Sequence, residues 1–317
     1  MKLRRLGQSD LQIAPIVLGG NVFGWSADEA TSFKILDAFV DAGFNAVDTA
    51  NTYSRWVPGH RGGESETVLG NWFRTPGKRN KVVIATKIGE DMGSGRSLKK
   101  DDVRREVEAS LKRLQIDCID LLQTHFDDEV TPPEETMAAY AELIAQGKVR
   151  AIGVSNVAPV RIKASLEASK RLGMPRYETL QPLYNLYDRQ QYETEYEPLA
   201  VAEKLGVITY WSLAAGFLTG KYRSAADADK SRTRGDRVKA FINPRGFAIL
   251  KALDRVAAAH GATLAQVSLA WLMARPSVTA PIASATNLDQ LADILKAAEL
   301  TLTGDDMAAL DQASAVT

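Results

Sequence analysis

The chain has 317 residues, and its 39 Lys and Arg residues are balanced by 39 Asp and Glu residues, so its formal net charge is 0. This balance argues against a broad nucleic-acid-binding or membrane-surface patch, and we expect neither kind of partner. The apolar fraction of 45% is too high for a disordered chain, and the length is ample for a large buried core.

The cysteine content and the lengths of the apolar runs indicate the cellular environment of the protein. Cys118 is the only cysteine, so an intrachain disulfide and a cysteine-based zinc site are excluded, and we predict no metal site. Residues 11–20 contain a proline and two glycines, unlike the apolar segment of a signal peptide. No run approaches the roughly 18 apolar residues of a membrane-spanning helix. We therefore expect a cytoplasmic protein, with Cys118 buried in its core.

Short apolar runs alternate with amphipathic stretches along the chain. The runs predict strands, and each is followed by a stretch whose apolar residues recur with helical spacing. In chain order the predicted strand–helix pairs are 13–18 with 31–42, 45–48 with 64–73, 82–86 with 101–114, 118–123 with 133–145, 149–154 with 160–172, 179–181 with 195–205, 207–210 with 265–273, and 278–282 with 288–297. Eight such units in a chain of this length are typical of a closed (β/α)8 barrel, the TIM barrel.

Three segments lie outside the eightfold pattern. Residues 218–245 are rich in charge and predict a long loop, and residues 247–260 predict one inserted helix. Residues 304–313 predict a C-terminal helix that is capped by Thr303. No linker or low-complexity tract interrupts the alternation. We therefore predict an α/β fold in which residues 1–317 form a single barrel domain.

Polar residues follow the predicted strands at their C-terminal ends, where parallel barrels carry their active sites. Asp48 ends the second strand with Tyr53 shortly after it, Lys87 follows the third strand, and His125 follows the fourth. A free tyrosine has a pKa of about 10, and a nearby ammonium lowers it toward the range useful for proton donation. We expect Tyr53 to be the acid, Lys87 to tune it, Asp48 to hold Lys87, and His125 to orient a carbonyl oxygen.

Two other interpretations of these residues stay open. Asp48 and Lys87 could form a buried structural ion pair with Tyr53 as a bystander, although such pairs are costly to bury. The same residues could also serve an unrelated barrel lyase or isomerase, which would bind no nicotinamide.

Five motifs, each at or just after a predicted strand end, together resemble the aldo-keto reductase family. They are Asp48-Thr49-Ala50 with Tyr53, Ala85-Thr86-Lys87, Gln123-Thr124-His125, Gly153-Val154-Ser155-Asn156, and the stretch GFLTGKY from Gly216 to Tyr222. The resemblance runs over about residues 3–297. It implies a (β/α)8 barrel, reduction of a small-molecule carbonyl substrate with NADPH, and catalytic roles for Asp48, Tyr53, Lys87 and His125.

The resemblance also implies the contacts of the cofactor and of the substrate. The implied cofactor contacts are Gly20 and Asn21 near the nicotinamide, Ser155, Asn156 and Gln181 on its carboxamide, Tyr210 stacked on its ring, Trp211, Ser212, Leu213, Gly216, Leu218 and Lys221 around the pyrophosphate, and Ser284, Thr286, Gln290 and Asp293 at the adenosine end. Phe23, Trp25 and Trp56 are candidate walls of the substrate pocket.

Two departures from the family pattern bear on the cofactor. The family often has Ser-Pro after the stacking aromatic, whereas Trp211-Ser212 stands here. The segment 282–294 lacks the Arg or Lys that usually grips the 2′-phosphate, and phosphate prefers cationic partners. Arg232 or Arg234 in the long loop is the candidate replacement. We expect NADPH, with NADH as the alternative.

One alternative function belongs to a different class. Some barrels that resemble this family are redox-sensing subunits bound to a membrane channel, and they turn over slowly. The four candidate catalytic residues do not separate that role from a reductase. The sequence also leaves the physiological substrate and the oligomeric state open.

Overall fold

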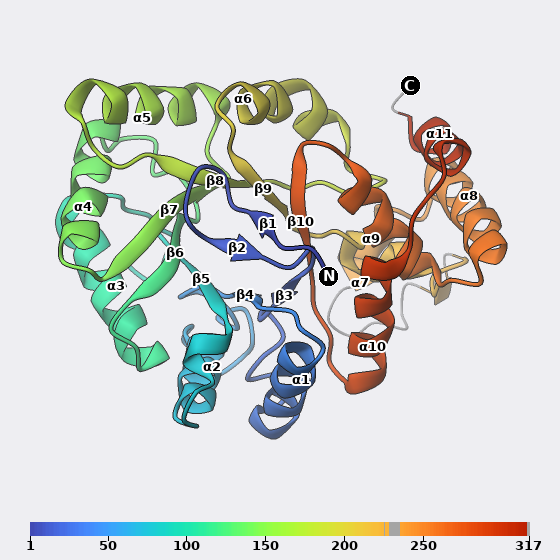
Figure 1. Cartoon of the computed structure of the whole chain (residues 1–317), viewed down its shortest axis with the longest axis horizontal. Helices are drawn as coiled ribbons and strands as arrows, with labels where there is room; N and C mark the ends of the chain where they lie inside the picture. Colours follow the sequence, from blue (N-terminus) through green and yellow to red (C-terminus); the bar gives the residue numbers. More distant parts are fainter. Residues whose placement is uncertain (225, 228–234, 316–317) are drawn as a thin grey trace.

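The computed structural model describes residues 1–224, 226–227 and 235–315, and it shows a closed barrel of eight parallel strands (Figure 1). Going round the barrel, the strands follow the order β10-β3-β4-β5-β6-β7-β8-β9. They are β3 (Val17–Gly19), β4 (Ala46–Asp48), β5 (Val83–Ile88), β6 (Ile119–Thr124), β7 (Val149–Ser155), β8 (Tyr177–Gln181), β9 (Gly206–Thr209) and β10 (Val278–Ala283). The predicted (β/α)8 architecture is confirmed.

Helices surround this barrel and connect its strands. Those of the ring are α1 (Glu29–Asp41), α2 (Glu64–Phe73), α3 (Lys100–Leu114), α4 (Pro133–Ala145), α5 (Pro159–Leu172), α6 (Glu197–Ala202), α9 (Leu264–Ala274) and α10 (Leu288–Lys296). The additional helices are α7 (Gly235–Lys239), α8 (Pro244–His260) and α11 (Gly304–Ala313). Figure 1 shows α8 and α11 together beyond α9, outside the ring. The inserted and C-terminal helices were thus predicted, whereas α7 was not.

The core has two layers because each strand is buried on both faces. The outer layer lies between strands and helices and contains large side chains such as Trp72 and Trp271. The inner layer fills the barrel, with alanines such as Ala46, Ala85 and Ala151 limiting the volume where side chains converge. Each fully buried Val, Leu, Ile or Phe side chain in these layers stabilises the fold by roughly 1.5–3 kcal/mol.

A short hairpin closes the N-terminal end of the barrel, and sequence patterning missed it. Strands β1 (Arg4–Arg5) and β2 (Gln12–Ile13) pair antiparallel, and Figure 1 shows them lying across the barrel opening. The close approach depends on two glycines, since a Cβ on Gly206 would lie 2.5 Å from the Gly7 nitrogen. With only two residues per strand, the hairpin offers too little alternation to be recognised.

Most predicted element boundaries lie within three residues of the observed ones, and the caps explain where several helices end. Thr303 forms a capping box with Asp306, as expected of a helix start. Gly173 ends α5 in the left-handed conformation.

Three predicted elements need correction. The strand expected over 13–18 is interrupted, with β2 ending at Ile13 and β3 starting at Val17. The helix expected over 195–205 is a π-helical turn, η2 (Tyr192–Tyr196), followed by the shorter α6. The long loop expected over 218–245 contains α7, and a 3₁₀ turn, η3 (Ala214–Thr219), precedes it.

Cys118 also lies elsewhere than expected. Its side chain is only half-buried just before β6, and burial raises the pKa of its thiol. The prediction of a fully buried core position was therefore wrong.

No single helix among residues 1–224, 226–227 and 235–315 is both long and apolar enough to cross a bilayer. Only α8 and α9 taken together reach that length and composition, and they are bent by 94° relative to each other.

A buried carboxylate on α2 hydrogen-bonds to both α3 and the barrel strand β5. Glu66 on α2 is fully buried. It accepts a hydrogen bond from Thr86 Oγ1 on β5 at 2.5 Å and one from Arg113 Nε on α3 at 2.6 Å. A buried carboxylate is tolerated when it is paired and hydrogen-bonded, and Arg113 supplies the cation that pairs with Glu66.

We predict that Arg113→Met lowers the free energy of unfolding by about 3 kcal/mol, because Glu66 is left buried without its cation. Arg105 on the same helix makes an exposed ion pair with Asp102, so Arg105→Met should change the free energy by less than about 0.5 kcal/mol. Urea unfolding of both variants measures the difference. Equal losses in the two variants would contradict the role of the buried pair.

Candidate active site

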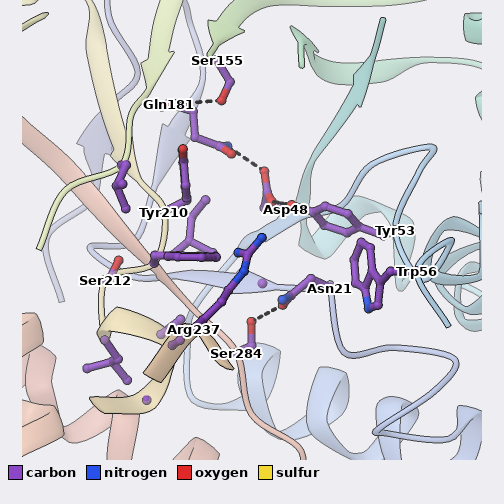
Figure 2. Close-up of a pocket in the computed structure, with 18 of the residues that line it drawn as sticks. Asn21, Asp48, Tyr53, Trp56, Ser155, Gln181, Tyr210, Ser212, Arg237 and Ser284 are labelled. Atoms are coloured by element: carbon purple, nitrogen blue, oxygen red, sulfur yellow. Dashed lines mark hydrogen bonds between the residues drawn. The ribbon is translucent and has the colours of Figure 1, made fainter. Parts of the chain in front are cut away.

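A cleft of about 1230 Å³ opens at the C-terminal ends of the barrel strands. Its lining comes from segments that are far apart in the chain, since each strand ends at this rim and continues into a loop. Figure 2 shows Ser155, Gln181 and Asp48 linked by hydrogen bonds above Arg237, with Asn21 and Ser284 below it. Clefts of this size and position are the usual ligand sites of parallel barrels.

Asp48, Lys87 and Tyr53 form a triangle of hydrogen bonds at the base of this cleft. Lys87 Nζ donates to Asp48 Oδ2 at 2.6 Å, to the Thr49 carbonyl oxygen at 2.8 Å and to the Tyr53 hydroxyl at 2.7 Å. An ammonium has three N–H donors, so all of them are used. The Tyr53 hydroxyl in turn donates to Asp48 Oδ2 at 3.0 Å.

Burial sets the protonation of this triangle. Lys87 is fully buried, and burial lowers the pKa of its ammonium while Asp48 opposes that shift. Burial and the Asp48 carboxylate raise the pKa of the Tyr53 phenol well above its ordinary value. From the sequence, Lys87 was expected to lower that pKa, so the direction of the shift was wrong. In this structure Tyr53 holds its proton, and the ammonium lies where it can stabilise the charge that a departing proton would leave.

His125 lies beside Tyr53 and keeps a neutral ring. The two ring centroids are 6.2 Å apart in an edge-to-face arrangement, and Phe126 packs on the other side of the imidazole. Burial, followed by the charge of Lys87, lowers the pKa of His125 well below its ordinary value. Its Nδ1 atom is buried and has no hydrogen-bond partner among the described residues. A polar atom left in this state is available to a ligand.

The second carboxylate oxygen of Asp48 is held by two glutamines. Gln181 Nε2 donates to Asp48 Oδ1 at 2.8 Å, and Gln123 Nε2 approaches the same oxygen at 3.4 Å. Gln123 is fully buried within the barrel, beneath the cleft. Both oxygens of the carboxylate are therefore fixed, and its orientation toward Lys87 and Tyr53 is set from inside the barrel.

A chain of polar groups continues along the cleft from Gln181. Ser155 Oγ donates to the Gln181 carbonyl oxygen at 2.8 Å, and Asn156 Nδ2 donates to Ser155 Oγ at 3.0 Å. The Tyr210 hydroxyl donates to Asn156 Oδ1 at 2.9 Å, while burial raises the pKa of Tyr210 to about 12. Tyr210 therefore presents a neutral ring to the cleft, fixed by its hydroxyl.

The loop after β9 adopts an uncommon backbone. Trp211, Ala214 and Ala215 have φ angles of 55°, 47° and 54°, and Gly216 follows at 91°. Left-handed backbone at non-glycine residues is strained and concentrates at functional sites. Runs of this kind turn successive N–H groups toward one concavity, which favours an anion. Lys221 lies against the same loop, since a Cβ on Gly216 would lie 3.3 Å from its Nζ.

The far end of the cleft is lined by the end of β10 and by α10. Ser284 Oγ donates to Asn21 Oδ1 at 2.5 Å, where the neighbouring strands β10 and β3 end, as Figure 2 shows. Gln290 and Asp293 project from α10, where Asp293 accepts hydrogen bonds from Thr263 Oγ1 and Gln266 Nε2. Polar side chains therefore line the cleft along its whole length.

The structure brings most of the residues chosen from the sequence to this cleft. They are Asn21, Asp48, Tyr53, His125, Ser155, Asn156, Gln181, Tyr210, Trp211, Ser212, Leu213, Gly216, Lys221, Ser284, Gln290 and Asp293, with Trp25 and Trp56 as walls. Lys87 reaches the site from behind, through its Nζ atom.

Four residues chosen from the sequence do not line the cleft. Phe23 is fully buried in the core, so its choice as a pocket wall was wrong. Leu218 is fully buried as well, Gly20 holds the Asp48 carbonyl with its N–H at 2.7 Å, and Thr286 hydrogen-bonds to Gln290. Each lies in a segment that follows a strand, but Phe23 and Leu218 are buried in the core there, and Gly20 has no side chain to line the cleft. Arg232 and Arg234 lie outside the described residues.

Arg237 on α7 lines the cleft, and it was not among the site residues predicted from the sequence. Its guanidinium carbon lies 4.0 Å from the ring centroid of Trp211, a cation–π contact. Figure 2 shows the side chain extending across the cleft between Tyr210 and Asn21. Only the charge-rich composition of the loop could have pointed to it, because no local pattern predicts which arginine turns inward.

Five rings form a continuous aromatic wall at the Tyr53 end of the cleft. Trp25 meets Trp56 edge-to-face at 6.0 Å, and Trp56 meets Tyr53 in the same way at 6.0 Å. His125 and Phe126 continue the series. Trp56 is 54% exposed, which is unusual for so large an apolar ring and is typical of a binding surface.

Comparison with known proteins places the chain in a family. Residues 15–315 match the aldo/keto reductase family. The chain is 38% identical over 311 residues to an uncharacterized oxidoreductase of Bacillus subtilis, YrpG, covering 95% of this chain and 92% of that protein. It is 33% identical over 296 residues to the Bacillus subtilis aldo-keto reductase YhdN, covering 91% and 85%.

Another relative has a name that points to a different role. A probable voltage-gated potassium channel subunit beta of Arabidopsis thaliana is 32% identical over 308 residues, covering 95% of this chain and 92% of that protein. With a family match over nearly the whole chain, this protein belongs to the aldo/keto reductase family of oxidoreductases.

Proposed function

We propose that this protein reduces an aldehyde or ketone to an alcohol, with NADPH as the hydride source and Tyr53 as the proton donor. The observation that carries the proposal is the Tyr53 hydroxyl, which lies at the cleft surface and is bonded to a buried ammonium and a buried carboxylate. Reduction of a carbonyl needs a hydride at carbon and a proton at oxygen, and this hydroxyl supplies the proton.

The chain's own groups fit a nicotinamide cofactor along the cleft. Ser155, Asn156 and Gln181 offer amide and hydroxyl groups beside the Tyr210 ring, and the strained loop of residues 211–216 offers N–H groups and Lys221 to phosphate. When bound, the reduced nicotinamide supplies the hydride for the carbonyl carbon. Ser284, Gln290 and Asp293 are the residues that would hold the adenosine end.

The triangle then performs the proton transfer. Tyr53 gives its proton to the carbonyl oxygen, and the negative charge left on the phenol lies 2.7 Å from Lys87 Nζ, which stabilises it. Asp48 keeps the buried lysine charged and aimed. His125 is neutral, so it has one N–H that can donate to the carbonyl oxygen and orient it.

The aromatic wall indicates which carbonyl compounds belong in the first assays. Flat rings in edge-to-face series accommodate another flat ring, and each such contact is worth about 0.5–1.5 kcal/mol beyond area burial. Trp56 packs directly against the Tyr53 ring, Trp25 extends the wall beyond Trp56, and Phe126 extends it beyond His125. We propose aryl aldehydes and aryl ketones as the preferred small-molecule substrates.

The relative from Arabidopsis thaliana favours a second candidate, a redox-sensing subunit that binds a membrane channel. Both candidates need the same cofactor cleft, and they differ in turnover. A reductase turns over at roughly 1–1,000 s⁻¹ on a good substrate, whereas a sensor is slow on every carbonyl tested. The triangle is compatible with both candidates, whereas the aromatic wall beside Tyr53 favours the reductase.

We predict that Tyr53→Phe lowers kcat for carbonyl reduction by at least about 100-fold, because the proton donor is removed. The dissociation constant for NADPH, measured by tryptophan fluorescence, should stay within about twofold, since the ring itself is kept. Tyr192→Phe is the matched control, because Tyr192 does not line the cleft. Turnover of Tyr53→Phe at the wild-type rate would contradict the assignment.

We further propose that Arg237 supplies the cation that the segment 282–294 lacks, and that it selects NADPH through the 2′-phosphate. Trp211 fluorescence should report binding directly. NADPH should bind the wild type at least about tenfold more tightly than NADH, and Arg237→Met should remove most of that difference. Arg255→Met, an exposed position on α8, is the control.

The same titrations can contradict the assignment in two ways. Equal weakening of NADPH and NADH by Arg237→Met would place the arginine on the shared diphosphate instead. Unchanged binding of both cofactors would remove Arg237 from the cofactor site altogether.

A further inference from the structure

Glu106 on α3 is a half-buried carboxylate that lies outside the cleft and has no place in the chemistry above. Its Oε2 atom accepts a hydrogen bond from Asn51 Nδ2 at 3.0 Å and one from the Gly89 backbone N–H at 2.9 Å. Burial raises the pKa of Glu106, and the two N–H donors oppose that shift. A helix residue therefore bonds through one oxygen to two loops that leave neighbouring strands.

Those two loops carry the proton donor and the ammonium. Asn51 lies two residues before Tyr53, in the segment that leaves β4, and Gly89 lies two residues after Lys87, at the end of β5. Asn51 is fully buried, and its backbone N–H donates to the Lys87 carbonyl oxygen at 3.1 Å. The Thr49 N–H also donates to the Ala85 carbonyl oxygen at 2.8 Å, so two backbone bonds join the segments, and Glu106 links them through its side chain.

Among the contacts of Asn51, the hydrogen bond to Glu106 is the one that fixes the Asn51 side chain. Its Oδ1 atom is buried and has no hydrogen-bond partner among the described residues. Glu106 is thus the partner that holds the amide. Gly89 adopts a φ of 91°, and a Cβ there would lie 2.7 Å from Leu98 Cδ2, so this turn is also tightly packed.

We propose that Glu106 is a positioning residue for proton transfer, which holds the Tyr53 segment and the Lys87 segment at the separation that keeps Nζ 2.7 Å from the phenol oxygen. The inference rests on the proposed function. It assigns Glu106 no contact with substrate or cofactor, since the residue does not line the cleft. Its effect reaches the reaction through Asn51 and Gly89 alone.

Loss of the Glu106 carboxylate has a consequence that follows from these hydrogen bonds. Without an acceptor at residue 106, the Asn51 amide and the Gly89 N–H are left without their partner, and each must find another by moving its loop. A movement of about 1 Å at a reacting group costs up to about 100-fold in rate. The cofactor contacts on β7, β8 and β9 lie on other strands and should not change.

The test compares Glu106→Met, which keeps the length but removes the acceptor, with Glu106→Gln, which keeps a carbonyl oxygen. Glu108→Met is the matched control on the same helix, because Glu108 makes only an exposed ion pair with Lys148. Three quantities are measured for each variant: kcat, the dissociation constant for NADPH, and the NMR shift of the Tyr53 ¹³Cζ, assigned with Tyr53→Phe. The last needs no catalysis.

For Glu106→Met we expect kcat to fall by at least about tenfold with NADPH affinity within about twofold, and the Tyr53 ¹³Cζ resonance to move. Glu106→Gln should keep kcat within about threefold, because its oxygen can accept both bonds. Glu108→Met should match the wild type in all three. An unmoved Tyr53 resonance with wild-type kcat in Glu106→Met would overturn the proposal, as would equal losses of kcat and NADPH affinity in Glu106→Met and Glu106→Gln.

Two further outcomes separate this proposal from the proposed function. If the wild type reduces no carbonyl but Glu106→Met still moves the Tyr53 resonance, the positioning role stands and the reductase assignment fails. If Glu106→Met does not fold, Asn51→Ala removes the same bond from the other side. That variant should move the Tyr53 resonance and lower kcat several-fold, and a resonance that stays in place would overturn the proposal.

Discussion

The structure depends on one buried ammonium. Lys87 is removed from water inside the barrel, and an unpaired charge there would cost several kcal/mol. Three acceptors compensate for the lost water: a carboxylate, a backbone carbonyl and a phenol. None of the three can be lost without leaving an N–H of the ammonium unsatisfied. The position of the Tyr53 hydroxyl is therefore a consequence of burying a charge, and so is the proton-donor role that we propose for it.

The register of the parallel barrel brings these side chains together. Residues that end neighbouring strands are paired across the sheet, as Gly19 is with Asp48, Lys87 with Gln123, and Ser155 with Gln181. Side chains from segments many residues apart thus meet at one rim. The buried ion pair of Glu66 and Arg113 fixes helices α2 and α3 behind the same strands, and the two glutamines fix Asp48 from within.

Much of this was predictable because the decisive signals are local. Each strand is a short apolar run followed at once by a polar residue, so the sequence places Asp48, Lys87 and His125 at strand ends without knowledge of the fold. The boundaries of α2, α4 and α11 follow equally from their periodic faces and local start and stop signals.

The rest depended on tertiary contacts that leave no local trace. Phe23 and Leu218 were placed near the cleft by their position in the chain, whereas the direction of a side chain in a loop is set by packing. Arg237 contacts Trp211 from helix α7, which lies in a segment whose composition predicted a loop. Glu106 and Gln123 hydrogen-bond to partners on other elements, and nothing in their own sequence neighbourhoods distinguishes them from ordinary helix and strand residues.

The most direct test of the account concerns the ammonium itself. Lys87→Met removes the charge and keeps the length, and stopped-flow measurement of NADPH oxidation in a single turnover with an aryl aldehyde isolates the chemical step from product release. If the buried ammonium stabilises the developing phenolate, the single-turnover rate falls by at least about 100-fold while NADPH still binds. A rate within about threefold of wild type would contradict it, because proton transfer would then proceed without the interaction around which the site is built.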